Sequence, residues 1–100
     1  MTYHVILAAR AEADIAEIVD WLSERSTPGA RAWLEALSSA LASLERQPDR
    51  FARVMHKDFP DREVRQHIFK TKNGHRYWLV YFIEGRTVTI VHVFGAGKNR

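Results

Sequence analysis

The sequence predicts an α+β domain of order β-α-α-β-β-β, in which a helical hairpin packs on one face of a small antiparallel sheet. Two segments of helical periodicity follow a short apolar stretch at the N-terminus. The second half instead holds alternating apolar runs separated by Asn73-Gly74 and Glu84-Gly85, which are typical of hairpin turns. One hundred residues with 46% hydrophobic content can build one core, so residues 1–100 are expected to form a single domain.

The first two elements are a strand and an amphipathic helix. The stretch from Tyr3 to Leu7 is short, apolar and β-branched, as a first strand should be. From about Arg10 the apolar residues recur at helical spacing and form one stripe: Ala11, Ile15, Ile18, Val19 and Leu22. Acidic residues take the remaining surface, which predicts a solvated helix face made of Glu12, Asp14, Glu17 and Asp20.

A second helix follows after a tight connection. Thr27 is the expected N-cap and Pro28 the expected first helical residue. The second apolar stripe consists of Ala30, Trp33, Leu34, Leu37, Leu41 and Leu44. Pro48 ends the helix because proline cannot continue its hydrogen-bond ladder. Two helices joined in this way form an antiparallel hairpin.

The remaining elements are an irregular segment and three strands. Between Arg50 and Asp61 we expect no regular structure, with four apolar anchors at Phe51, Val54, Met55 and Phe59. The Asn73-Gly74 turn predicts that Phe69 lies opposite Trp78 and His67 opposite Val80. A two-residue loop at Glu84-Gly85 would place Tyr81 opposite Val88.

This register divides the side chains between two faces of the sheet, because residues directly opposite share a face. One face is then apolar throughout and should pack under the helices: Val64, Ile68, Leu79, Tyr81, Val88 and Ile90. The other face mixes aromatic with basic residues: Arg65, His67, Phe69, Trp78, Val80, Phe82, Thr89 and Val91. A bulged loop at residues 84–86 would instead swap the faces of the last strand.

The second face predicts a partner. Two helices joined by so short a turn can cover one face only, and an uncovered apolar patch on a small protein marks an interaction site. Charge points the same way. Residues 1–49 have a net charge of −4 and residues 50–100 a net charge of +7, so the second half faces either an anionic partner or solvent.

Several classes of function are excluded. The chain has no cysteine, so disulfides, thiol catalysis and cysteine-bound metals are ruled out. Its five histidines do not stand at metal-ligand spacings, and no metal or other cofactor is expected. No apolar run is long enough to span a membrane, and the N-terminus lacks the pattern of a signal peptide. The sequence therefore predicts a cytoplasmic protein.

Two residues of the second face offer a candidate chemistry. His67 and Arg65 are two residues apart on one strand, so they share a face. Histidine can act as a general acid or base, and arginine can stabilise charge on a phosphate, as metal-independent RNA cleavage requires. The alternative is an ordinary solvent-facing histidine without a second base. For Trp78, the alternatives are an anchor for a partner and a stacking surface for a base.

The order of elements resembles the RelE/ParE superfamily of bacterial type II toxin–antitoxin toxins. The resemblance runs nearly end to end, through "AEADIAEIVDWL", "STPGARAWLEAL", "REVRQHIFKTKNGHRYWLVYF" and "GRTVTIVHV". It implies a toxin that causes growth arrest and plasmid stabilisation, neutralised by a cognate antitoxin in a hetero-oligomer. The target would be DNA gyrase for ParE-like members, or mRNA on the ribosome for RelE-like members, which are endonucleases.

Departures from the superfamily's pattern favour gyrase inhibition. Members commonly read Tyr-Arg at the start of the penultimate strand, where this chain has Tyr77-Trp78. The C-terminal His/Arg/Tyr cluster of the superfamily is reduced here to Lys98 and Arg100. If the protein were a ribonuclease, its catalytic residues would be Arg65, His67 and Lys98. Contacts with the target or antitoxin are expected at Arg65, His67, Phe69, Trp78, Val80 and Lys98.

Overall fold

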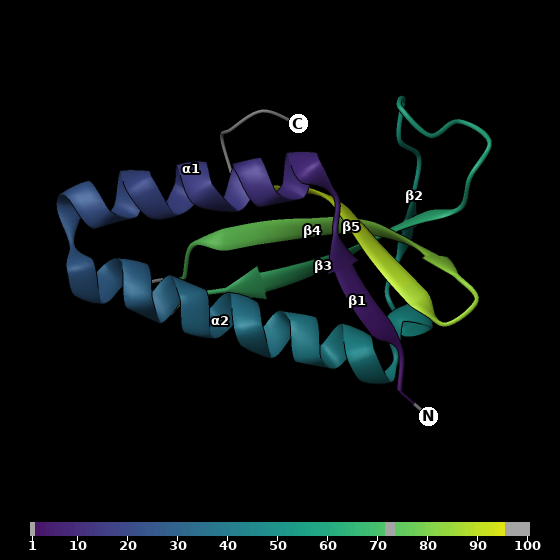
Figure 1. Cartoon of the computed structure of the whole chain (residues 1–100), viewed down its shortest axis with the longest axis horizontal. Helices are drawn as coiled ribbons and strands as arrows, with labels where there is room; N and C mark the ends of the chain where they lie inside the picture. The colour runs from purple at the N-terminus through teal and green to yellow at the C-terminus, as the bar shows by residue number, and fades with distance from the viewer. Residues whose placement is uncertain (1, 72–73, 96–100) are drawn as a thin grey trace.

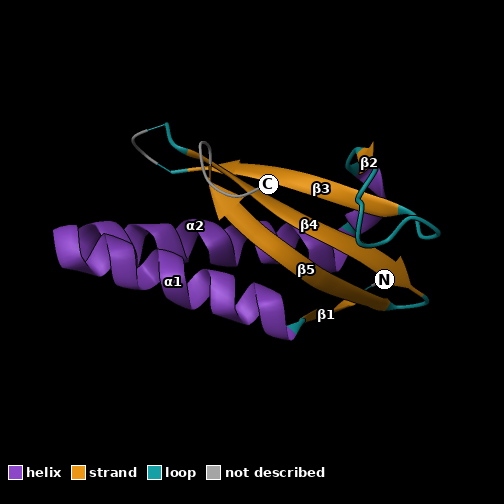
Figure 2. Ribbon diagram, turned by 90° about the horizontal axis from the view of Figure 1, so that it is seen from above, coloured by secondary structure: helices purple, strands orange, loops and turns teal. Residues whose placement is uncertain are grey.

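The computed structural model of the chain describes residues 2–71 and 74–95. A helical hairpin lies along one face of a twisted five-stranded sheet (Figures 1 and 2). The elements are, in order, β1 (His4–Leu7), α1 (Ala9–Arg25), α2 (Thr27–Arg46), the short 3₁₀ helix η1 (Pro48–Arg50), β2 (Arg53–Val54), β3 (Val64–Lys70), β4 (Arg76–Glu84) and β5 (Thr87–Gly95). The predicted α+β class and the order β-α-α-β-β-β are confirmed, with β2 as a two-residue addition in the segment expected to be irregular.

The strands lie in the order β1-β5-β4-β3-β2. Three of the four pairings are antiparallel, but β1 runs parallel to β5, with Val5 opposite Val88. A purely antiparallel sheet was therefore the wrong expectation for this one pair. After β1 the chain forms the helical hairpin and then the other strands. The last strand, β5, returns to lie beside the first. Because the pairing of β1 with β5 ends at Ile90, the second half of β5 forms an edge of the sheet among the described strands.

The connection between the helices is a single extended residue, Ser26. Its Oγ accepts a hydrogen bond from the backbone N–H of Gly29 at 3.0 Å, which makes Ser26 the N-cap of α2. The predicted cap, Thr27, is instead the first helical residue, followed by Pro28. The prediction was wrong by one residue because either hydroxyl could have served.

The core lies between the hairpin and one face of the sheet. Leu79 and Ile90 are completely buried. They belong to one cluster with the stripes of both helices, including Ile15, Ile18, Leu37 and Leu41. The prediction that these strand and helix residues pack together is confirmed. Leu34 is the exception in the second stripe, since it is 43% exposed.

The predicted register between β3 and β4 was wrong by one residue. Phe69 lies opposite Tyr77 and His67 opposite Leu79, one position away from the predicted partners Trp78 and Val80. Gly74 adopts a φ of +83° and its N–H donates to the carbonyl of Thr71, a geometry that glycine adopts without strain. This shift reverses the predicted faces of β3. Val64 and Ile68 lie on the face away from the helices, whereas Arg65, His67 and Phe69 lie on the helix side.

In the hairpin of β4 and β5 the apolar side chains lie on the predicted faces of the sheet. Its loop is Gly85-Arg86 rather than Glu84-Gly85, which shifts the register by two residues and places Tyr81 opposite Ile90. Gly85 has a φ of +57° and no other loop residue has positive φ, as in a type II′ turn. A β-bulge then shifts the pairing between Val80 and Tyr81, which leaves Val80 opposite His92.

The second face of the sheet is partly covered by the chain itself. Val54 and Phe59, from the segment between η1 and β3, pack against a cluster of Val64, Val80 and Val91. Met55, expected to be an anchor, is 95% exposed. Beyond this cover the face presents Ile68, which is 44% exposed, with Trp78 and Phe94, which are half-buried.

Candidate functional site

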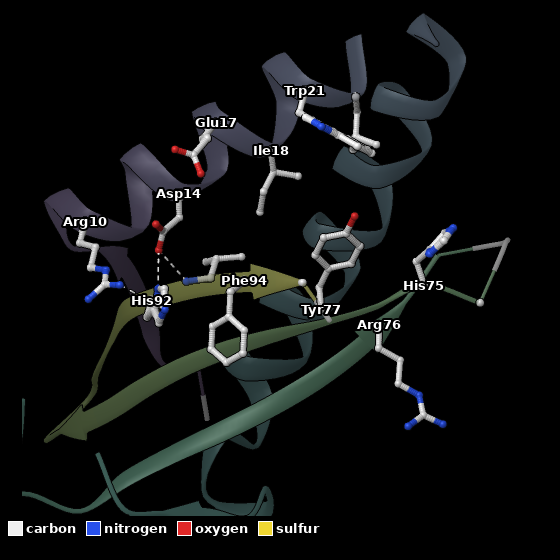
Figure 3. A pocket seen from close by; sticks show the side chains of 14 residues that line it. Arg10, Asp14, Glu17, Ile18, Trp21, His75, Arg76, Tyr77, His92 and Phe94 are labelled. Carbon is white, nitrogen blue, oxygen red and sulfur yellow. Dashed lines mark hydrogen bonds and ion pairs between the residues drawn. The ribbon is translucent and has the colours of Figure 1, made fainter. Parts of the chain in front are cut away.

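A groove with a volume of about 670 Å³ lies between α1 and the adjoining ends of β4 and β5 (Figure 3). Its volume is within the usual range for ligand-binding sites. One wall is the stripe of α1 that begins at Arg10 and ends at Leu22. The other wall joins residues 74–77, the first two residues of β4 and the two that precede it, to the last four residues of β5.

The acidic wall of the groove is fixed by Asp14. Its Oδ2 accepts a hydrogen bond from the backbone N–H of Val93 at 2.9 Å and lies 2.6 Å from Nδ1 of His92. The guanidinium of Arg10 lies 3.3 Å from Nε2 of His92. A guanidinium can only donate, so Nε2 accepts and Nδ1 carries the proton that binds Asp14. The cluster ties the first turns of α1 to the bulged end of β5.

The floor of the groove is aromatic. The ring of Tyr77 packs at 5.4 Å and nearly perpendicular to the ring of the buried Trp33, and it stacks on Phe69. Gly95 lies directly under this ring, because a Cβ at that position would come within 2.9 Å of it. Burial raises the pKa of the Tyr77 phenol, so this hydroxyl stays protonated at neutral pH.

Both rims of the groove carry exposed side chains. On α1, Trp21 is 45% exposed, and the guanidinium of Arg25 lies 3.7 Å from its ring centroid. Across the groove, His75 and Arg76 are exposed at the start of β4. Figure 3 shows Arg76 directed away from the helix, so its charge lies at the outer lip.

Sequence reasoning missed this groove. Asp14 had been assigned to a solvated helix face, and His92 to no role. One signal was present, since a histidine inside the apolar run "VTIVHVF" is buried on either face and requires a polar partner. The position of that partner, 78 residues earlier in the chain, was not readable from local pattern.

Arg65 does not present a free charge on an open face. Its Nη1 donates to the carbonyl of Phe51 at 2.7 Å, and its Nη2 lies 2.7 Å from a carboxylate oxygen of Glu63. Only 15% of the side chain is exposed. The guanidinium joins β3 to the segment after η1, which is a structural task.

His67 is covered as well. Its ring lies 4.0 Å from the ring of Phe51. Burial lowers the pKa of His67, and the charge of Arg50 lowers it further, so the imidazole is neutral near pH 7. Arg65 and His67 do share a face, as predicted, but it is the helix side of the sheet.

The other predicted contact residues divide between core and surface. Phe69 is 8% exposed and packs beside Trp33, and Val80 is 3% exposed, so neither is available for a partner. Trp78 does lie on the face away from the helices, where its ring stacks on Phe94 at 5.5 Å with the planes 6° apart. Lys98 lies outside the described residues.

The described residues contain no group of three or more acidic or histidine side chains placed to hold a metal ion. Within the same residues, neither helix is long and apolar enough to cross a membrane.

One comparison with known proteins identifies a family. The family model described as "ParE toxin of type II toxin-antitoxin system, parDE" matches residues 5–100, which is nearly the whole chain. A search of curated proteins found no match.

Proposed function

This chain belongs to the ParE toxin family of type II toxin–antitoxin systems, and from that premise we propose that it arrests growth by binding and inhibiting DNA gyrase. Membership of the family makes it the toxin of such a system and implies a cognate antitoxin as its partner. The finer points are the target and the way in which the target is disabled.

The observation that carries the proposal is the engagement of Arg65. A ribonuclease that used Arg65 would need its guanidinium free to meet the phosphate in the transition state. Here that guanidinium binds Phe51 and Glu63, and the ring of His67 beside it lies against the ring of Phe51. A toxin without an open cleaving pair acts most simply by binding, which requires shape and charge but no proton transfer.

The runner-up is a ribosome-dependent mRNA endonuclease, and one observation favours it. One wall of the groove is lined by His75, Arg76, Tyr77 and His92, and these are residue types that cleave RNA without metal. Two of them are poorly suited to the task. The pKa of Tyr77 is raised by burial, and both ring nitrogens of His92 are engaged by Asp14 and Arg10. Binding is therefore the better proposal.

The proposed antitoxin surface includes the part of the second face that the described residues leave open. Ile68, Trp78 and Phe94 form an apolar patch there, and a patch of this kind on a small protein is normally covered by a partner. Trp78 is the member retained from the contacts predicted by sequence. A toxin held by its antitoxin in the cytoplasm would stabilise a plasmid that encodes both.

Controlled expression separates the two candidate functions. Cells expressing the toxin without antitoxin would be sampled early, before secondary effects, for plasmid supercoiling and for the 5′ ends of translated mRNA. The proposal expects loss of negative supercoiling with mRNA ends unchanged. Prompt codon-phased mRNA cuts with normal supercoiling would reject gyrase in favour of the ribonuclease. The supercoiling activity of purified gyrase, measured with and without the toxin, provides the direct control.

A further inference from the structure

We propose that the β2–β3 loop, residues 55–63, is a lid that closes part of the second face of the sheet and opens while the rest of the protein stays folded. The loop leaves β2 and returns to β3 at one end of the sheet (Figure 1). It covers a buried apolar cluster of three valines on the face away from the helical hairpin: Val64, Val80 and Val91. The proposal concerns a movement within the chain and does not rest on the identity of the toxin's target.

The loop is not joined to the sheet through its backbone. Among the described residues, its backbone hydrogen bonds are internal: the N–H of Phe59 donates to the carbonyl of His56 at 3.0 Å, and the N–H of Arg62 donates to the carbonyl of Phe59 at 3.3 Å. The pairing of Val54 with Val64 fixes the two ends of the loop. Opening therefore breaks no hydrogen bond between strands, and segments held in this way open at free energies well below that of global unfolding.

One aromatic ring provides most of the apolar contact between the loop and the sheet. Phe59 packs against the three valines, and its ring centroid lies 5.7 Å from that of Phe82 on β4. The ring of His56, 5.5 Å from that of Phe59, is the other half-buried side chain of the loop. The remaining loop residues are exposed, including Met55. Phe59 is therefore the anchor on which closure of the lid depends.

Two ion pairs hold the loop at separate points. A carboxylate oxygen of Asp58 lies 3.7 Å from Nη1 of Arg10 on α1, and Nη1 of Arg62 lies 2.9 Å from a carboxylate oxygen of Glu84 on β4. Arg10 is held from the other side as well, since its Nη2 lies 3.3 Å from Nε2 of His92. All four paired side chains are about half exposed, and exposed ion pairs stabilise only weakly. The two pairs therefore close the lid without locking it.

Opening of the lid enlarges an apolar surface that the described residues already present. Val80 lies two residues from Trp78 on β4, so both side chains are on the same face of the sheet. With the loop displaced, Val80 and Val91 join the patch formed by Ile68, Trp78 and Phe94. A large contiguous apolar surface marks an interaction site. The closed loop therefore restricts the apolar surface that the free protein exposes.

Thiol labelling of the folded protein tests the lid, because the chain contains no cysteine of its own. Val80→Cys places one thiol beneath the loop, and Val88→Cys places one at an equally buried site beneath the helical hairpin. The probe is a maleimide, applied without denaturant and in low urea. Val80→Cys should be labelled about tenfold faster or more, at a rate that low urea leaves unchanged, because a local opening exposes little surface. Val91→Cys is a second reporter beneath the loop, and urea midpoints establish that each variant is folded.

Changes within the loop show whether the loop itself controls the labelling. In the Val80→Cys protein, Phe59→Ala should raise the rate about tenfold or more, since it removes the anchor. Asp58→Asn should raise it about two- to fivefold, as the loss of an exposed ion pair implies. The matched control is Asp61→Asn, the same change of charge at an exposed loop residue outside the ion pairs found among the described residues. It should leave the rate nearly unchanged.

Each alternative outcome overturns the proposal. Equal rates for Val80→Cys and Val88→Cys, with the same dependence on urea, would show that the second face opens only when the whole protein unfolds. Labelling of Val80→Cys as fast as that of the urea-unfolded chain would show that the loop does not close the face. Equal effects of Asp58→Asn and Asp61→Asn would show that the pair with Arg10 does not hold the loop.

Discussion

Asp14 Oδ2 lies 2.6 Å from Nδ1 of His92 and binds the backbone N–H of the next residue, Val93, at 2.9 Å. One carboxylate oxygen thus satisfies a buried imidazole and an edge amide together, and connects α1 to β5. Such contacts decide the position of one groove wall against the other, which links the stability of the fold to the shape of the groove.

Removing this carboxylate should destabilise the protein. Asp14→Ala leaves the imidazole of His92, a residue only 3% exposed, without its acceptor, and a buried unsatisfied polar group costs about 1–3 kcal/mol. Glu17→Ala, one turn later and exposed, should change the free energy of unfolding by less than about 0.5 kcal/mol. Urea denaturation of both variants measures the difference. Equal stabilities would show that the cluster contributes nothing to folding.

The core provides a second prediction. Leu79 and Ile90 are fully buried beneath the hairpin, so truncating either to alanine should cost about 2–5 kcal/mol. Met55→Ala serves as the control because Met55 is 95% exposed, so shortening its side chain leaves no cavity. Thermal and urea unfolding would be followed by circular dichroism. A core variant as stable as Met55→Ala would contradict the assignment of faces.

The helices and this core were predictable because helical periodicity identifies a buried stripe without knowledge of anything else in the chain. The stripe containing Ile15 and Ile18 could face only the sheet, and the alternation of Leu79 with Tyr81 identified the matching face. Neither inference depends on the length of a loop. Both predictions were therefore correct although the strand register was predicted wrongly.

Which side chains of β3 face the helices was not predictable, because this assignment does depend on the length of a loop. The observed pairing of β3 with β4 differs from the predicted pairing by one position, and one position reverses every side chain of the strand. Ordinarily polar residues on the wet side reveal the mistake. In β3 and β4 both sides are apolar, since the segment containing Val54 and Phe59 covers part of the second face. Either register therefore looked acceptable.

The groove could not be predicted from local sequence patterns. It depends on the parallel pairing of β1 with β5, which ends at Ile90, so that among the described residues α1 lies alongside the remainder of β5. Nothing in the sequence near Asp14 indicates that His92 will lie beside it. Only the assembled topology brings them together.

The buried state of His67 predicts a pH dependence with a definite sign. Burial and the nearby charge of Arg50 lower the pKa of this histidine in the folded protein, while the unfolded chain keeps a value near 6.5. As the pH falls below about 6.5, the unfolded chain therefore binds a proton that the folded protein refuses, and stability is lost. His67→Phe, which retains a ring against Phe51, removes this effect.

Chemical denaturation of the wild type and His67→Phe at about pH 7.5 and about pH 5.5 tests the sign, because the other titrating groups are common to both proteins. The wild type should lose more stability than the variant on acidification. A variant that loses as much as the wild type would contradict a lowered pKa at residue 67.

Trp78 should contribute to antitoxin binding through the open face of the sheet. Its ring, stacked on Phe94, is the largest side chain of the uncovered patch, and truncating an aromatic hot spot costs more than about 1 kcal/mol of binding free energy. Trp78→Ala should weaken the complex by that amount in calorimetry, with Leu34→Ala as the control. Binding that leaves hydrogen exchange along β4 unaltered would argue against this surface.

The last prediction separates an inhibitor from a nuclease at a single residue. If His67 were a catalytic base, His67→Ala would reduce cleavage about 10²–10⁴-fold and abolish growth arrest. Because its ring is neutral, lies against Phe51 and is on the helix side of the sheet, we expect His67→Ala to keep most of its toxicity. Arg65→Ala should lose toxicity through misfolding instead, since its guanidinium holds Phe51 and Glu63. Growth curves paired with urea midpoints distinguish the two: a folded His67→Ala protein that no longer arrests growth would support the ribonuclease.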